Sequence, residues 1–151
     1  GKGFATEALA LLINYCTEIL ELRNLYCQIH GDNQASVSLF EKAGFMEQLR
    51  NKSKTLTSYL FFIINQVNKI LGEEQYQIIT PQNIEDRGAQ VSIIAKANGK
   101  LIFDQLVANN VLGDWREPNV IRLAPAPFYC SYEDMYEFGQ ILKQGILTLQ
   151  K

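Results

Sequence analysis

The stretch Asn33-Gln-Ala-Ser-Val-Ser-Leu-Phe-Glu-Lys-Ala-Gly-Phe-Met-Glu-Gln-Leu49 decides how the chain is divided. Asn33 is a favourable N-cap residue, and Gly44 suits the left-handed position that follows a helix. We therefore predict a short helix over residues 34–43. The residues expected on its buried side are Val37, Phe40 and Ala43.

The segment that follows is predicted to be one long helix. Residues 46–71 contain neither glycine nor proline, and their apolar side chains recur at intervals of three, four and seven residues. Such spacing is typical of an amphipathic helix. The apolar residues concerned are Leu49, Leu56, Leu60, Ile63, Val67, Ile70 and Leu71. We expect a connecting helix near residues 46–70.

The rest of the chain has the pattern of a small α/β domain. Residues 89–97 alternate between apolar and polar side chains, as in a strand with one buried face. Residues 120–124 form a second expected strand, and helices are expected at residues 101–108 and after Ser131. The predicted fold class is α/β, with two layers: a small antiparallel or mixed sheet with helices packed on one face.

The first part of the chain is predicted to contain a glycine loop, a helix and a strand. Apolar residues at helical spacing between Ala5 and Leu20 predict a helix of about four turns. Gly1 and Gly3 precede it, where backbone N–H groups and the helix dipole favour phosphate. Residues 25–29 are predicted to form a strand.

Residues 1 to about 34, with an overlap to residue 45, resemble the GNAT superfamily of N-acetyltransferases. The resemblance rests on the first nine residues, on Gly31-Asp32-Asn33, and on Ala35, Ser36, Leu39, Phe40, Glu41, Lys42, Gly44 and Phe45. It implies that the glycine loop binds the pyrophosphate of acetyl-CoA through backbone amides, while a later Asn helps to position cofactor or substrate. The residues that would take these roles are Lys2, Gly3, Phe4, Ala5 and Asn33.

This acetyltransferase-like segment departs from its family in two places. The family's loop motif begins with a Gln or Arg three residues before its first glycine, a position that would precede Gly1. Many members also use a tyrosine of the later helix as general acid, where this chain has Phe40. We therefore expect at most half of an acetyl-CoA site.

Residues from about 35 to 151 resemble the C-terminal small domain of kynureninase, so that residues 35–46 fit both families. The matching blocks are Leu49–Ser53, Leu56–Leu60, Ile78–Pro81, Arg87–Ser92, Asp114–Arg116 and Pro118–Tyr129. Kynureninases use pyridoxal phosphate to hydrolyse kynurenine to anthranilate and alanine in tryptophan catabolism. The resemblance implies that Arg122 binds the substrate α-carboxylate, for which a planar guanidinium is well suited.

The rest of a kynureninase active site has no match here. The lysine that forms the Schiff base, the phosphate-binding residues and the acid facing the pyridine nitrogen belong to the family's large domain. We therefore expect a fragment or chimera that is inactive alone and binds neither pyridoxal phosphate nor acetyl-CoA tightly. Two alternatives remain: an acetyl-CoA-binding acetyltransferase fragment, and a structural chimera with no activity.

Composition argues against several other classes of function. A net charge of -2 and a pI near 5.4 give no electrostatic reason to expect nucleic acid or an anionic membrane as partner. The three cysteines follow no disulfide or zinc pattern, and the single histidine, His30, has no partner at a ligand spacing, so we expect no metal site. We expect a cytoplasmic protein that forms homo-oligomers through the apolar surface of its first helix.

Overall fold

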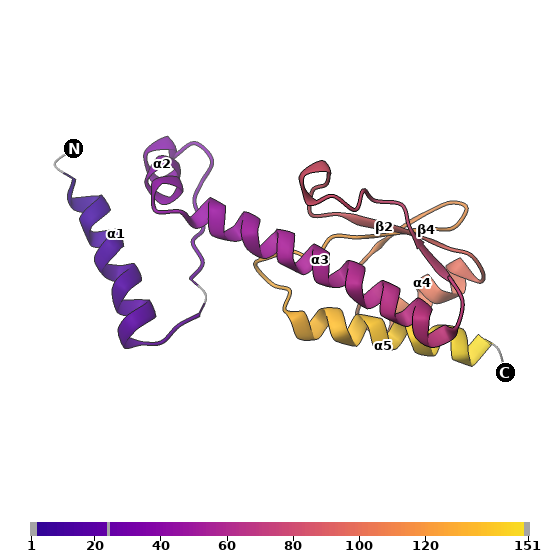
Figure 1. The fold of residues 1–151 in the computed structure, drawn as a ribbon. Coiled ribbons are helices and arrows are strands. Elements are labelled where there is room, and N and C mark those ends of the chain that lie inside the picture. Colours follow the sequence, from indigo (N-terminus) through magenta and orange to yellow (C-terminus); the bar gives the residue numbers. More distant parts are fainter. Residues whose placement is uncertain (1–2, 24, 150–151) are drawn as a thin grey trace. The chain divides into compact units, whose positions relative to one another are not determined.

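The computed structural model describes residues 3–23 and 25–149. The chain divides into two compact units, Gly1–Arg50 and Asn51–Lys151. Among the described residues, no helix combines the length and the apolarity that a bilayer crossing requires. Figure 1 shows the elements of each unit in sequence colours.

The first unit contains the helices expected from the sequence. Helix α1 spans Phe4–Asn14 and continues into a π-helical segment, η1, at Tyr15–Ile19. Helix α2 spans Gln34–Lys42. Its start is fixed by Asn33, whose Oδ1 accepts a hydrogen bond from the backbone N–H of Ser36 at 3.1 Å. Gly44 follows the helix with φ +80°, a conformation that favours glycine.

The predicted strand at residues 25–29 is wrong. These residues belong to no helix or strand, and all strands that the structure describes lie in the second unit. A strand forms only where a neighbouring strand pairs with its N–H and C=O groups. The described part of the first unit offers no such neighbour, so β-propensity alone does not produce a strand there.

The long helix α3 spans Phe45–Leu71, in agreement with the prediction. Its buried residues are Ser53, Leu56, Thr57, Leu60, Phe61, Ile63, Ile64 and Val67. They recur at the helical period along one face, which packs into the core of the second unit.

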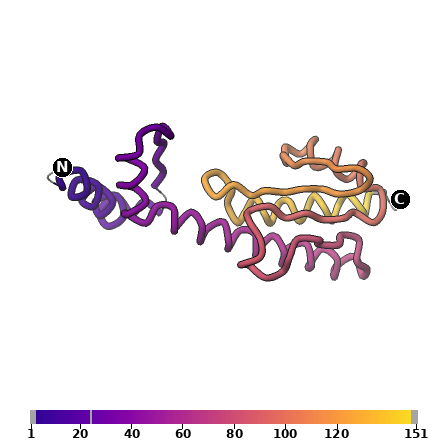
Figure 2. The backbone as a smooth tube through the Cα atoms, turned by 90° about the horizontal axis from the view of Figure 1, so that it is seen from above, coloured from indigo at the N-terminus to yellow at the C-terminus, as the bar shows by residue number. Residues whose placement is uncertain are grey.

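The second unit is a four-stranded antiparallel sheet with helices on one face, as the sequence predicts. The strands are β1 (Tyr76–Ile78), β2 (Val91–Ala95), β3 (Asp114–Arg116) and β4 (Val120–Leu123), and their spatial order is β1-β2-β4-β3. The helices of this unit after α3 are the 3-10 helix η2 (Ile84–Asp86), α4 (Gly99–Ala108) and α5 (Tyr132–Leu149). Seen from above in Figure 2, the strands of the sheet pass over α5.

The core lies between one face of this sheet and the helices α3, α4 and α5. The sheet contributes Tyr76, Val91, Ile93, Ala95, Ile121 and Leu123, all buried. Side chains alternate between the faces of a strand, so the intervening residues lie on the opposite face. That face carries Gln77, Ser92, Ile94, Val120 and Arg122, and we call it the open face because the three helices pack on the other side.

Candidate functional site

Arg122 occupies the middle of the open face. It lies on β4, the strand between β2 and β3, where it is paired with Ser92 on one side and with Asp114 on the other. Residues directly opposite in an antiparallel sheet project to the same face. The register therefore gathers a hydroxyl, a guanidinium and a carboxylate in one row across three strands.

The guanidinium of Arg122 is held from two sides. Its Nε and Nη2 both donate hydrogen bonds to Oε1 of Gln90, at 3.2 and 3.0 Å. Its Nη1 lies 3.3 Å from Oδ2 of Asp114. An arginine side chain carries five N–H donors, so one N–H of Nη2 and at least one of Nη1 are left for a ligand. Two such donors are the number that a bidentate carboxylate engages.

The hydrogen bonds continue from Gln90 into β2 and the loop before it. Nε2 of Gln90 donates to Oγ of Ser92 at 3.1 Å. The backbone N–H of Ser92 in turn donates to Oγ1 of Thr80 at 2.7 Å. Gln90 is therefore oriented at both ends of its amide.

The charges of this cluster favour an anion. Oδ2 of Asp114 lies 3.0 Å from Nε of Arg116 as well as close to Arg122, so one carboxylate faces two guanidinium groups. The three side chains together carry one net positive charge. A small anion such as a carboxylate would be attracted to the open face at this point.

Arg87, in contrast to Arg122, stabilises the fold of the second unit. Its Nη2 donates to Oγ of Ser58 on α3 at 2.9 Å, and its Nη1 donates to the carbonyl oxygens of Pro81 and Gln82. The guanidinium also lies over the ring of Phe61, 4.3 Å from its centroid. Arg87 is buried and ties the loop after β1 to the long helix.

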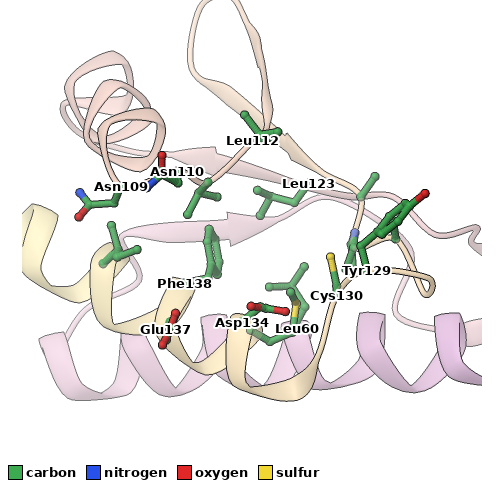
Figure 3. Close-up of a pocket in the computed structure, with 16 residues that line it drawn as sticks. Leu60, Asn109, Asn110, Leu112, Leu123, Tyr129, Cys130, Asp134, Glu137 and Phe138 are labelled. Atoms are coloured by element: carbon green, nitrogen blue, oxygen red, sulfur yellow. The ribbon is translucent and has the colours of Figure 1, made fainter. Parts of the chain in front are cut away.

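A cavity of about 620 Å³ lies on the helical side of the sheet. Leu60, Leu123, Met135 and Phe138 are among its apolar lining residues. Figure 3 shows Asp134 and Glu137 projecting from α5 beside it. None of the described lysines and arginines lines it, so it does not suit a phosphate or a carboxylate. Leu123 and Arg122 are neighbours on one strand and face opposite sides, which separates this cavity from the arginine cluster.

Three lysines of the second unit do not fit covalent binding of pyridoxal phosphate. A Schiff-base lysine requires a neutral amine in a desolvated pocket. Lys54 instead pairs with Glu85 at 2.7 Å, while Lys96 pairs with Glu74 and Lys100 with Asp104 in exposed ion pairs. The cavity has no lysine among the described residues that line it.

The acetyl-CoA residues expected from the sequence fall at two helix starts. Gly3 precedes α1 with φ +80°, and its carbonyl oxygen accepts hydrogen bonds from the N–H groups of Thr6 and Glu7. Phe4 and Ala5 form the exposed first turn. Asn33 instead caps α2 through its Oδ1. Lys2 lies outside the described residues.

The described residues offer no candidate metal site. They contain no group of three His, Cys, Asp or Glu side chains that could hold an ion. His30 and Asp32 approach to 3.5 Å, but both are almost fully exposed. Cys16, Cys27 and Cys130 are free thiols.

Comparison with known proteins assigns the larger part of the chain. The model of the kynureninase C-terminal domain matches residues 49–142, which is more than half of the chain. The chain belongs to this family. The kynureninase of Flavobacterium johnsoniae is 54% identical over 113 residues, which are 75% of this chain and 26% of that protein. The kynureninase of Schistosoma japonicum is 36% identical over 110 residues, or 72% of this chain and 25% of that protein.

The chain thus spans about a quarter of the length of these relatives. A second model, the acetyltransferase (GNAT) domain, matches residues 1–46. Both resemblances expected from the sequence are confirmed. A match of 113 residues in a chain of 151 begins no later than residue 39, so the two similarities overlap between residues 39 and 46.

The structure adds partners that the sequence did not assign to the site. Arg122 was predicted as the carboxylate-binding residue, but Asp114 was recognised only as part of a matching block. Gln90 was likewise recognised only as part of a matching block, and the structure bonds it to both Arg122 and Ser92. The signal that could have found Asp114 is the strand register, because Asp114 and Arg122 form a directly opposed pair.

Proposed function

We propose that the larger part of this chain, residues from about 35 onward, is the carboxylate-binding small domain of a kynureninase, with Arg122 as the anchor for the substrate α-carboxylate. The observation that carries the proposal is the position of the Arg122 guanidinium on the open face. Gln90 and Asp114 hold it there, and N–H groups of its two terminal nitrogens are left for a ligand. In kynureninases, pyridoxal phosphate supplies the electron sink for cleavage of kynurenine. The described residues of this chain would bind the substrate carboxylate.

Binding of L-kynurenine to the full chain tests this assignment. We expect weak, millimolar binding, because a single exposed arginine contributes little affinity. Arg122→Ala should weaken it about tenfold or more, because a hydrogen bond to a charged group contributes about 1.5–3 kcal/mol. Arg50→Ala, which removes an exposed arginine of the first unit, is the matched control. The measurement is an NMR titration with L-kynurenine that follows the backbone amide signals. Equal titration curves for the wild type and Arg122→Ala would reject Arg122 as the anchor.

We further propose that the chain alone is catalytically inactive. Support comes from Lys54, Lys96 and Lys100, which lie in ion pairs, and from the cavity, whose lining among the described residues includes no lysine or arginine. Added pyridoxal phosphate should then give no aldimine absorbance, and kynurenine should not be cleaved. Appreciable turnover, lost on reduction with borohydride, would overturn this proposal.

A second candidate function is acetyl-CoA binding by the first unit. It is favoured by the acetyltransferase match at residues 1–46 and by the exposed first turn of α1. Isothermal titration calorimetry with acetyl-CoA tests it, with acetyl phosphate as the control for non-specific anion binding. An absence of heat at millimolar acetyl-CoA would remove this candidate and leave a structural role for the first unit.

Two further properties complete the proposal. We place the protein in the cytoplasm, in keeping with its three free thiols. We also propose that it forms homo-oligomers, because α1 exposes large apolar side chains such as Phe4 and Leu11.

A further inference from the structure

We propose that Gln90 is a positioning residue for Arg122: its side-chain carbonyl fixes the guanidinium plane and leaves donors of Nη1 and Nη2 to a carboxylate. This inference deepens the proposed function and rests on it for the identity of the ligand. The hold of Gln90 on Arg122 can nevertheless be measured without any ligand.

The geometry of the contact carries the inference. One oxygen, Oε1 of Gln90, accepts from two different nitrogens of Arg122, Nε at 3.2 Å and Nη2 at 3.0 Å. Two contacts on one edge of a planar group define the orientation of that plane, which a single contact does not. The edge that Gln90 occupies contains Nε, so the donors that remain belong to the two terminal nitrogens.

Gln90 is itself anchored, which makes it a suitable support. Its Nε2 donates to Oγ of Ser92 at 3.1 Å, and the Ser92 backbone N–H is held by Thr80. An exposed glutamine without such contacts would sample several rotamers and would restrain its partner little. Here the sequence Gln90-Val91-Ser92 places the amide and the hydroxyl two residues apart, on the same side of the strand.

The neutrality of the amide also matters. A carboxylate at this position would hold the guanidinium equally well but would cancel the charge that attracts the ligand. Asp114 is already present and is shared with Arg116, so the cluster keeps one positive charge only if residue 90 is uncharged. A glutamine meets both requirements, since it accepts hydrogen bonds and adds no charge.

The experiment separates these two roles with three variants of the full chain. Gln90→Ala removes the acceptor, Gln90→Glu keeps an acceptor and adds a negative charge, and Gln77→Ala removes a glutamine elsewhere on the open face. The readouts are rotation about the Arg122 Nε–Cζ bond, measured by nitrogen-15 NMR without ligand, and affinity for L-kynurenine. Far-ultraviolet circular dichroism checks that each variant is folded.

For Gln90→Ala we expect Nε–Cζ rotation to be roughly tenfold faster, the factor that corresponds to a hydrogen bond of ordinary strength, and kynurenine affinity to fall three- to tenfold. For Gln90→Glu we expect rotation to stay slow while affinity falls. Gln77→Ala should match the wild type in both.

Unchanged rotation in Gln90→Ala would overturn the positioning role, whatever happens to binding. Faster rotation with unchanged affinity would also overturn it, since the orientation would then have no effect on the ligand. If the wild type does not bind kynurenine, or binds it equally well after Arg122→Ala, the proposed function fails. The rotation rate still decides whether Gln90 restrains Arg122.

Discussion

Asp114 and Arg122 stand opposite each other on β3 and β4, and Oδ2 of Asp114 lies 3.3 Å from Nη1 of Arg122. The same oxygen lies 3.0 Å from Nε of Arg116. The side chains of Arg122 and Asp114 are 35% and 47% exposed. Solvent therefore screens the pair, and its contribution to stability should be below about 1 kcal/mol. Its main consequence is electrostatic, because Asp114 halves the positive charge of the cluster.

Asp114→Asn should therefore change ligand binding more than stability. Removal of the carboxylate leaves two uncompensated guanidinium groups on the open face, so affinity for a carboxylate ligand should rise about two- to threefold at low salt. The gain should shrink as salt is added, because these groups are partly exposed. NMR titration at two ionic strengths measures the effect, and urea unfolding measures stability.

Asp104→Asn is the control for the Asp114 substitution. It removes the carboxylate of another exposed ion pair, that with Lys100 on α4, and adds the same charge to the protein. Affinity for the carboxylate ligand should not change. A loss of affinity in Asp114→Asn would show instead that Asp114 serves mainly to orient Arg122.

The helices of this protein follow from local sequence signals. Asn33 and Gly44 mark the ends of α2, and the structure gives them the expected capping geometry. The last helix was predicted to follow Ser131, and in the structure Oδ2 of Asp134 accepts hydrogen bonds from both N–H and Oγ–H of Ser131. Such signals lie within a few residues of the element that they define, so one sequence suffices to read them.

The strands and the Arg122 cluster depend on residues that are distant in the sequence. This explains why the strand at residues 25–29 was predicted wrongly and why the contacts of Arg122 were not predicted. β1 and β3 have three residues each, too few for an alternating pattern to stand out. Residues 25–29 have strand-like composition, but the described part of their unit contains no neighbouring strand. Arg122 was found through family resemblance, whereas its contacts with Gln90 and Asp114 depend on how three strands align.

Gly139 on α5 should resist substitution by alanine. A Cβ at this position would overlap Cγ2 of Ile63 on α3, a β-branched side chain with little freedom inside a helix. Gly139→Ala should therefore lower the free energy of unfolding by about 1–3 kcal/mol, although alanine favours helices. Urea unfolding followed by circular dichroism measures the change.

Gly145 provides the matched comparison within the same helix. A Cβ there would lie 2.9 Å from Oε1 of Gln105, the end of a flexible side chain, and 3.8 Å from Ile102. Because Gln105 can move aside, Gly145→Ala should be neutral or stabilising by up to about 1 kcal/mol. Equal effects of the two substitutions would contradict the close packing of α5 against α3 at Gly139.

Tyr76 should make stability fall at alkaline pH. Its hydroxyl donates to the carbonyl oxygen of Leu142 at 3.0 Å within the core, and burial raises the pKa of Tyr76 above its ordinary value. Above about pH 10 the unfolded chain releases this proton while the folded protein keeps it. The unfolded state then binds fewer protons, so the free energy of unfolding decreases as pH rises.

Tyr76→Phe isolates this contribution from the other groups that titrate at high pH. The variant should be less stable by about 1 kcal/mol at pH 7, because a buried hydrogen bond is lost. Its stability should then fall less steeply than that of the wild type between about pH 9.5 and 11. Urea unfolding across this range measures both slopes, and parallel slopes would mean that Tyr76 ionises as easily in the folded protein as in the unfolded chain.

The surface of α1 should drive self-association of the full chain. Phe4 and Leu11 are 70% and 64% exposed, and Ile19 in the following π-helical segment is 65% exposed. Apolar surface of this kind on a helix is usually covered by another element. Light scattering after gel filtration should therefore give a mass above that of the monomer, and the mass should rise with concentration.

Leu11→Lys should lower this mass, because a charge at this position opposes burial. Asn14→Lys adds the same charge at an exposed polar position of the same helix and should leave the mass unchanged. A monomeric wild type at all concentrations would reject the oligomer, and equal dissociation by both variants would assign the effect to net charge.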